Sequence, residues 1–146
     1  TNHAYFNLNN NELIGNSFLK INAEKYLELD KSLVPTGKKL LVKNTSLDFR
    51  NSKKLGKIRL DDYFVVNQTN SPVVEFFEPK SGINMSVFTN QPGLVVFTPP
   101  HFQAICFETQ KFSNTPNILS FPSTLINPRE VYRHKTSFVF NIQKNI

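Results

Sequence analysis

The sequence predicts an all-β protein with the architecture of a β-sandwich. Three observations lead to this prediction: the chain consists of short apolar or alternating runs, turn residues separate the runs, and helical periodicity is nearly absent. The clearest run is 136–142, where Thr136, Phe138 and Phe140 alternate with smaller or polar residues. A strand with this pattern presents one apolar face that can pack against a second sheet.

The expected strands are rich in β-branched and aromatic residues and lie between turn signals. In chain order they are 39–43, 63–66, 73–77, 84–89, 94–98, 104–108 and 136–142. Glycine, proline or asparagine clusters between them predict turns. These turns are 9–11, 35–37, 81–82, 92–93, 99–100 and 127–128.

Length and composition indicate one globular unit. The chain has 146 residues, of which 39% are hydrophobic and 14 are Phe, which is enough apolar material for one core. Without an internal repeat, linker or composition shift, we expect a single domain over 1–146. No run is long enough to span a membrane, and the amino terminus lacks a signal-peptide pattern, so we expect a soluble, cytoplasmic protein. A lone Cys106 fits a reducing compartment.

The net charge of +6 raises the question of nucleic-acid binding. The basic residues occur as scattered pairs, Lys38-Lys39 and Lys53-Lys54, with acidic residues between them. Binding to polynucleotides requires clustered phosphate contacts. The pattern therefore favours a solvated surface, with neither nucleic acid nor membrane as a partner.

Two segments combine reactive side chains on one strand face. In an extended amino-terminal segment, His3 and Tyr5 point to the same side. In the run 104–108, Cys106 and Glu108 share a face on which the neighbouring side chains are small. The carboxylate therefore has space for a ligand beside it.

These two segments resemble the motifs of the aldose 1-epimerases, or galactose mutarotases. The strings are Thr-Asn-His-Ala-Tyr-Phe-Asn-Leu at 1–8 and Glu-Thr-Gln at 108–110. Other landmarks follow in the family's order, at 19–27, 34–37, 47–50, 78–82, 90–94 and 121–124. The resemblance covers nearly the whole chain and implies a galactose mutarotase-type β-sandwich. It also implies the carboxy-terminal half of such a protein, without the amino-terminal half that supplies another histidine and an arginine to the sugar site.

The resemblance implies an enzyme that interconverts the α and β anomers of an aldohexose such as galactose or glucose. Ring opening needs one group that protonates the ring oxygen and one that deprotonates the anomeric hydroxyl. By resemblance, His3 is the acid and Glu108 the base. Reference pKa values of about 6.5 for histidine and about 4.3 for glutamate suit these roles once the environment of the glutamate raises its pKa somewhat. No metal or cofactor is implied, and the three histidines are too far apart in sequence for a recognisable ligand pattern.

Asp61 matches the family's sugar-binding aspartate. A carboxylate can accept hydrogen bonds from two hydroxyl groups at once. The usual next residue is histidine, whereas here it is Asp62, so the assignment of the two carboxylates stays open, as does a simple turn role for Asp61. Val95 also replaces a sugar-contacting glutamine of many relatives.

Three other residues are expected to be structural. Arg50 is expected in an ion pair, Cys106 as a small buried thiol, and His101 in an exposed turn.

Three functions remain open at this point. The first is an aldose 1-epimerase that uses His3, Asp61 and Glu108, with an aldohexose as its small-molecule partner. The second is a non-catalytic carbohydrate-binding relative, which the departures at Asp62 and Val95 favour. The third is an inactive fragment that exposes core surface. The sequence does not decide between glucose and galactose, and it leaves the oligomeric state open.

Overall fold

The structure is a computed structural model that describes residues 1–10 and 12–142. Two short 3-10 helices, η1 (Ile14–Asn16) and η2 (Thr115–Asn117), accompany the strands. The strands are β1 (Phe18–Ile21), β2 (Ala23–Leu29), β3 (Pro35–Leu41), β4 (Lys53–Lys54), β5 (Asp61–Val66), β6 (Val74–Glu78), β7 (Ile83–Thr89), β8 (Gly93–Phe97), β9 (Cys106–Gln110) and β10 (Thr136–Ile142). The prediction of an all-β protein is confirmed.

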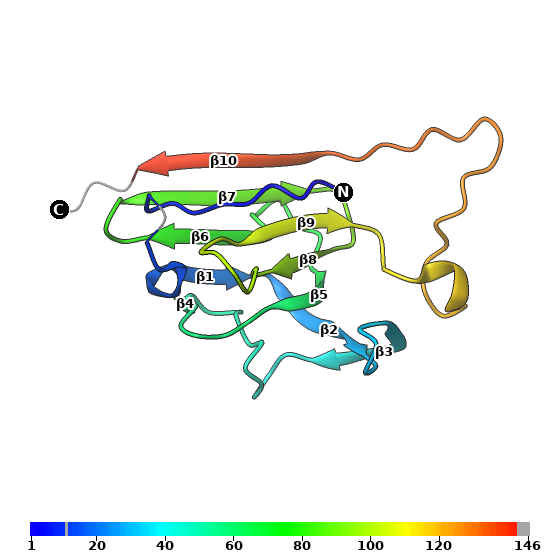
Figure 1. Cartoon of the computed structure of the whole chain (residues 1–146). Helices are drawn as coiled ribbons and strands as arrows, with labels where there is room; N and C mark the ends of the chain where they lie inside the picture. The colour runs from blue at the N-terminus through cyan, green and yellow to red at the C-terminus, as the bar shows by residue number, and fades with distance from the viewer. Residues whose placement is uncertain (11, 143–146) are drawn as a thin grey trace.

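The strands form two antiparallel five-stranded sheets (Figure 1). The first sheet has the order β10-β7-β6-β1-β4, and the second has the order β3-β2-β5-β8-β9. Within the described residues, no helix combines the length and the apolar character that crossing a bilayer requires.

The two sheets pack face to face over a shared hydrophobic core. Most inward side chains of both sheets are apolar and buried, in line with the alternation along each strand. The aromatic rings of Phe76 on β6 and Phe107 on β9 meet edge to face, with their centroids 5.8 Å apart. Leu94, Val96 and Ile105 lie in the same cluster and are fully buried.

Most of the predicted strands are present, with ends shifted by one or a few residues. The 136–142 prediction is confirmed with the same bounds as β10. Three strands were not predicted, namely β1, β2 and β4. In β2, charged residues break the apolar pattern, and an irregularity between Ala23 and Lys25 shifts its register against β5, so that strict alternation is lost.

The predicted turn at 35–37 is wrong, because these residues begin β3. Gly37 has a φ of 100°, and the register of β2 against β3 shifts between Leu27 and Leu29. Glycine here accommodates an irregular strand rather than a reversal of the chain. The predicted turn at 9–11 includes residue 11, which lies outside the described residues.

The segment between β9 and β10 leaves the second sheet and returns to the first (Figure 1). It carries η2, and Phe112 and Phe121 within it pack on Leu27 and Tyr63, which lie on the face of the second sheet that points away from the first. β10 then pairs with β7 over seven residues. This long connection covers part of the outer face of the second sheet.

Leu94 and Leu119 offer a matched test of the core, because one is fully buried and the other fully exposed. We expect Leu94→Ala to lower the free energy of unfolding by about 2–5 kcal/mol, since it leaves a cavity between the sheets. Leu119→Ala should change it by less than about 0.5 kcal/mol. Urea denaturation followed by circular dichroism measures both. Equal effects of the two substitutions would contradict the burial of Leu94 between the sheets.

Arg50 forms the ion pair expected from the sequence. Its guanidinium donates hydrogen bonds to Asp48 at 2.9 and 2.8 Å and to Glu24 at 3.1 Å. The hydrogen bonds from Arg50 lower the pKa of Asp48 to about 2. Because the folded pKa lies below the ordinary value, the stabilisation is present above about pH 3.9 and is lost as the pH falls toward 2.

We therefore expect Asp48→Asn to destabilise the protein at pH 6 and to have a progressively smaller effect between pH 4 and pH 3. Urea midpoints of both proteins at each pH measure the difference. Arg50→Gln should reproduce the same pH dependence, since it removes the partner. A difference that stays constant over this range would show that Asp48 contributes through shape rather than charge.

Candidate functional site

The outer face of the second sheet carries two neighbouring rows of cross-strand side chains. Antiparallel pairing aligns residues of β5, β8 and β9 on this face. The rows are Asp61–Phe97–Cys106 and Tyr63–Val95–Glu108. The same alternation sends Ile105 and Phe107 into the core. The register thus brings two carboxylates from distant parts of the sequence to one surface.

His3 reaches this surface from the amino-terminal segment. One antiparallel bridge holds the segment: the amide of Phe6 donates to the carbonyl of Ile105 at 2.9 Å, and the amide of Ile105 donates to Phe6 at 3.0 Å. The ring of Phe6 also packs against Phe138 on β10, with centroids 5.1 Å apart. The expected strand at the amino terminus is therefore a single bridge, although His3 and Tyr5 do lie side by side, with ring centroids 5.0 Å apart.

His3 and Glu108 are in direct contact. The Nε2 atom of His3 lies 3.1 Å from Oε1 of Glu108, and its Nδ1 atom lies 3.5 Å from Sγ of Cys106. The imidazole also meets the ring of Phe97 edge to face at 5.7 Å. Half of the His3 side chain is exposed, whereas only 12% of the Glu108 side chain is. The pair thus has a buried member and a member that solvent or a ligand can reach.

Burial is the largest influence on the carboxylate and the thiol. Desolvation raises the pKa of Glu108, the charge of His3 opposes that rise, and the negative charge of Asp61 adds to it. Desolvation and the charge of Glu108 raise the pKa of Cys106 to about 12. The thiol is therefore protonated at neutral pH, whereas Glu108 is a stronger base than an exposed glutamate.

The two adjacent aspartates lie on opposite faces of β5. Asp61 pairs with Phe97 on the outer face and is exposed, whereas Asp62 points the other way and is partly buried, and this burial raises its pKa. Asp61 is therefore the carboxylate that shares a face with Glu108. Its role in binding a ligand stays a prediction, as do the roles of His3 and Glu108.

A cavity of about 170 Å³ adjoins Asp61. It lies between the start of β5 and the connection that follows β9. Its walls are Leu29, Leu33, Pro35, Asp61, Tyr63, Val95 and Ser113. Val95 and Tyr63 belong to the row of Glu108, so the cavity lies next to the histidine–glutamate pair.

Several residues around His3 and Tyr5 were not predicted from the sequence. The rings of Tyr5 and Phe102 lie 5.0 Å apart, and about half of each side chain is exposed. Phe97 contacts His3 from β8, and Cys106 contacts it from β9. The exposure of Phe102 could have been predicted from the sequence, because an aromatic residue in a proline-rich turn has no strand face to bury it. The Cys106 contact depends on three-dimensional packing.

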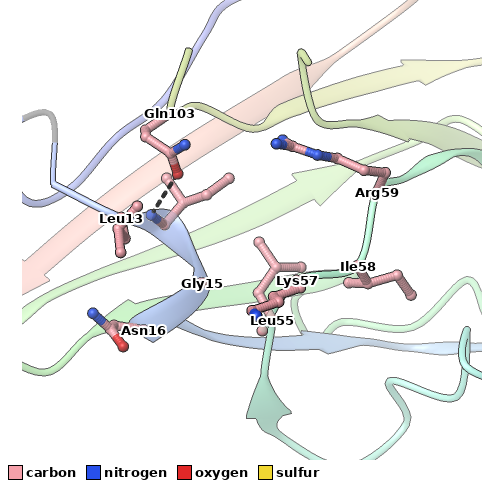
Figure 2. A pocket seen from close by; sticks show the side chains of 10 residues that line it. Leu13, Gly15, Asn16, Leu55, Lys57, Ile58, Arg59 and Gln103 are labelled. Carbon is pink, nitrogen blue, oxygen red and sulfur yellow. Dashed lines mark hydrogen bonds between the residues drawn. The ribbon is translucent and has the colours of Figure 1, made fainter. Parts of the chain in front are cut away.

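A second, larger cavity lies apart from these residues. Figure 2 shows its lining around η1 and the segment 55–59, where the side-chain oxygen of Gln103 accepts a hydrogen bond from the amide of Ile14 at 3.3 Å. Its volume is about 460 Å³, and Leu13, Leu55 and Ile58 give it largely apolar walls. None of His3, Asp61 and Glu108 lines it, so this cavity is not part of the candidate site.

The other two histidines are not part of the cluster that His3 forms with Cys106 and Glu108. His101 is exposed, as expected for a turn residue. The Nε2 atom of His134 lies 3.0 Å from Oγ1 of Thr109, and burial lowers its pKa. The neutral form of His134 that results suits a hydrogen-bonding role between β9 and the start of β10.

Comparison with known proteins gives consistent similarities. A family model described as aldose 1-epimerase matches residues 1–139. The galactose mutarotase of Sus scrofa is 30% identical over 97% of this chain and 49% of its own length. A solved structure of a GalM/aldose epimerase homologue from C. elegans has a TM-score of 0.87 at 27% identity, covering 96% of this chain and 50% of that one.

A second solved structure, galactose 1-epimerase from Lactobacillus acidophilus NCFM, has a TM-score of 0.82 at 25% identity, over 94% of this chain and 47% of that one. The predicted galactose mutarotase-type β-sandwich is thus confirmed. This chain spans about half the length of the relatives it matches.

The bridge at Phe6 can be tested as the element that positions His3. We expect Phe6→Ala to loosen the amino-terminal segment, because it removes the packing on Phe138, and to speed amide hydrogen exchange at positions 6 and 105 at least about tenfold. Leu13→Ala, at a residue that is 62% exposed, is the control. Unchanged exchange in Phe6→Ala would show that the packing of Phe6 on Phe138 does not hold the segment.

Proposed function

Because this chain belongs to the aldose 1-epimerase family, we propose that it provides an acid and base pair for the interconversion of the α and β anomers of an aldohexose such as galactose or glucose. The observation that supports this most is the contact of His3 with Glu108 at 3.1 Å. The two reacting oxygens of the sugar, the ring oxygen and the anomeric hydroxyl oxygen, are bonded to the same carbon. Two groups this close together can address both oxygens at once.

In the proposed reaction, protonated His3 donates its proton to the ring oxygen while Glu108 takes the proton of the anomeric hydroxyl. The bond between C1 and the ring oxygen breaks, and the C1–O1 bond becomes a carbonyl. Rotation about the C1–C2 bond presents the other face of the carbonyl to the ring hydroxyl. On closure, His3 takes its proton back and Glu108 returns one to O1, so no proton or electron is gained or lost.

The local environment supports this division of roles. Burial raises the pKa of Glu108, which strengthens it as a base. His3 is half exposed, so a sugar can reach it and separate it from Glu108. The protein without sugar therefore holds the two groups against each other, and binding must replace that contact with two contacts to the substrate.

Asp61 and the neighbouring aromatic residues are proposed to bind the sugar. Asp61 lines the cavity of about 170 Å³ and can accept hydrogen bonds from hydroxyl groups. Tyr5 presents a partly exposed ring beside His3, and Phe102 presents one beside Tyr5. A pyranose has an apolar face of C–H groups that packs on such rings.

We also infer that this chain corresponds to the carboxy-terminal half of its relatives, since its motifs follow that half in order. The relatives are about twice as long as this chain, so their activity belongs to the longer proteins.

Polarimetry of freshly dissolved α-D-galactose and α-D-glucose tests the proposal. We expect the purified chain to accelerate mutarotation, and His3→Asn and Glu108→Gln each to lower the acceleration by at least about 100-fold, because each removes one proton-transfer group. Glu75→Gln, which alters a surface carboxylate paired with Lys20, is the control and should keep the rate.

Each result has a distinct meaning. If Glu108→Gln accelerates mutarotation as well as the unaltered chain does, the acid and base assignment is wrong. If the unaltered chain binds sugar without acceleration, it is a carbohydrate-binding relative. The absence of both would show that these residues do not form a working site by themselves.

A further inference from the structure

Three different metal-ligating side chains meet at the candidate site. One ligand atom each from His3, Cys106 and Glu108 lies within 4.8 Å of the others. The proposed reaction uses His3 and Glu108 but gives no role to Cys106. The thiol is nevertheless in contact with the imidazole, at 3.5 Å.

The chemistry of the three donors favours one kind of metal ion. Thiolate sulfur, imidazole nitrogen and carboxylate oxygen are the three ligand types of zinc sites in proteins. Magnesium and calcium prefer oxygen ligands only, so the thiol argues against them. Three protein ligands leave a fourth zinc position open to water.

The backbone already holds the ligands close to the spacing that zinc needs. Bond lengths of about 2.0–2.3 Å place the ligand atoms of a tetrahedral site roughly 3.3–3.8 Å apart. Cys106 and Glu108 are two residues apart on one face of β9, and His3 contacts both of them, at 3.5 and 3.1 Å. These contacts use different ring nitrogens. The half-exposed imidazole must therefore turn so that one nitrogen faces the metal.

We propose that His3, Cys106 and Glu108 bind a zinc ion, and that bound zinc inhibits the anomer interconversion. The thiol of Cys106 releases its proton to solvent as the zinc–sulfur bond forms. Inhibition follows because the metal occupies the imidazole nitrogen and the carboxylate that would transfer protons. The inhibitory part rests on the proposed function, whereas the binding part does not.

Cobalt(II) is a suitable probe because it occupies zinc sites and absorbs light. We expect Co²⁺ added to the purified chain to give a thiolate-to-cobalt band in the near ultraviolet and tetrahedral bands in the visible, and zinc to displace both. Cys106→Ala should abolish the thiolate band and weaken zinc binding at least about tenfold, since even groups outside the ligand set change affinity by 10–100-fold. Glu108→Gln, which keeps the side-chain shape, should weaken zinc binding similarly.

His101→Gln is the matched control, because it removes an exposed histidine that is not one of the three ligands. It should leave the cobalt spectrum and the zinc affinity unchanged. Circular dichroism establishes that each variant is folded. Equal zinc affinity in the unaltered chain, Cys106→Ala and Glu108→Gln would overturn the proposal, as would a cobalt spectrum without a thiolate band.

Two readouts separate this inference from the proposed function. A thiolate–cobalt band without any acceleration of mutarotation supports the metal site and counts against the epimerase activity. Acceleration that is insensitive to zinc, with no thiolate band, supports the activity and overturns the metal site. Zinc inhibition of equal strength in the unaltered chain and Cys106→Ala, each measured against its own zinc-free rate, would also overturn it.

Discussion

The alternation along β9 is the constraint on which the candidate site depends. Ile105 and Phe107 are fully buried between the sheets, so Cys106 and Glu108 must point to the opposite face. A slip of one residue would bury the Glu108 carboxylate in the hydrophobic core, which is far more costly than any gain at the surface. The packing of Phe107 on Phe76 therefore fixes the position of a carboxylate that neither ring touches. The burial of Ile105 and Phe107 thus stabilises the fold and at the same time positions the site residues of β9.

The two members of the histidine–glutamate pair are held in different ways. Glu108 lies in a strand that pairs with β8 and is almost fully buried. His3 lies beyond a single bridge at Phe6, on a segment with no further strand pairing among the described residues. Local opening of such a segment costs less than opening a strand that is paired along its whole length, as β9 is with β8. This asymmetry suits a site in which one group must move aside to admit a ligand while the other stays in place.

Periodicity predicted the all-β class and the full extent of β10, because these depend on local alternation. It failed for β2, where charged residues and an irregular register hide the pattern, and for 35–37, where a glycine with positive φ sits inside β3. His3 and Glu108 came from the resemblance to a family. The contact of Cys106 with His3 could not be predicted, since it joins residues about a hundred positions apart through cross-strand register. The register of β5 against β8 and β9 was needed to tell which of Asp61 and Asp62 shares a face with Glu108.

The same packing explains why a thiol can lie beside the histidine–glutamate pair without disturbing the contact between the two. Burial and the charge of Glu108 raise the pKa of Cys106 to about 12, so at neutral pH the thiol keeps its proton and leaves the imidazole to interact with the carboxylate. A small side chain also suits this place, because Cys106 is opposite Phe97 on β8 and its sulfur contacts Nδ1 of His3. A metal ion changes this balance, since a zinc–sulfur bond compensates for the loss of the proton. In the proposed metal complex, His3, Glu108 and Cys106 all act as ligands, instead of as the proposed acid, the proposed base and a small neighbouring side chain. The proposed proton transfer and the proposed metal binding would therefore compete for the same nitrogen and oxygen atoms.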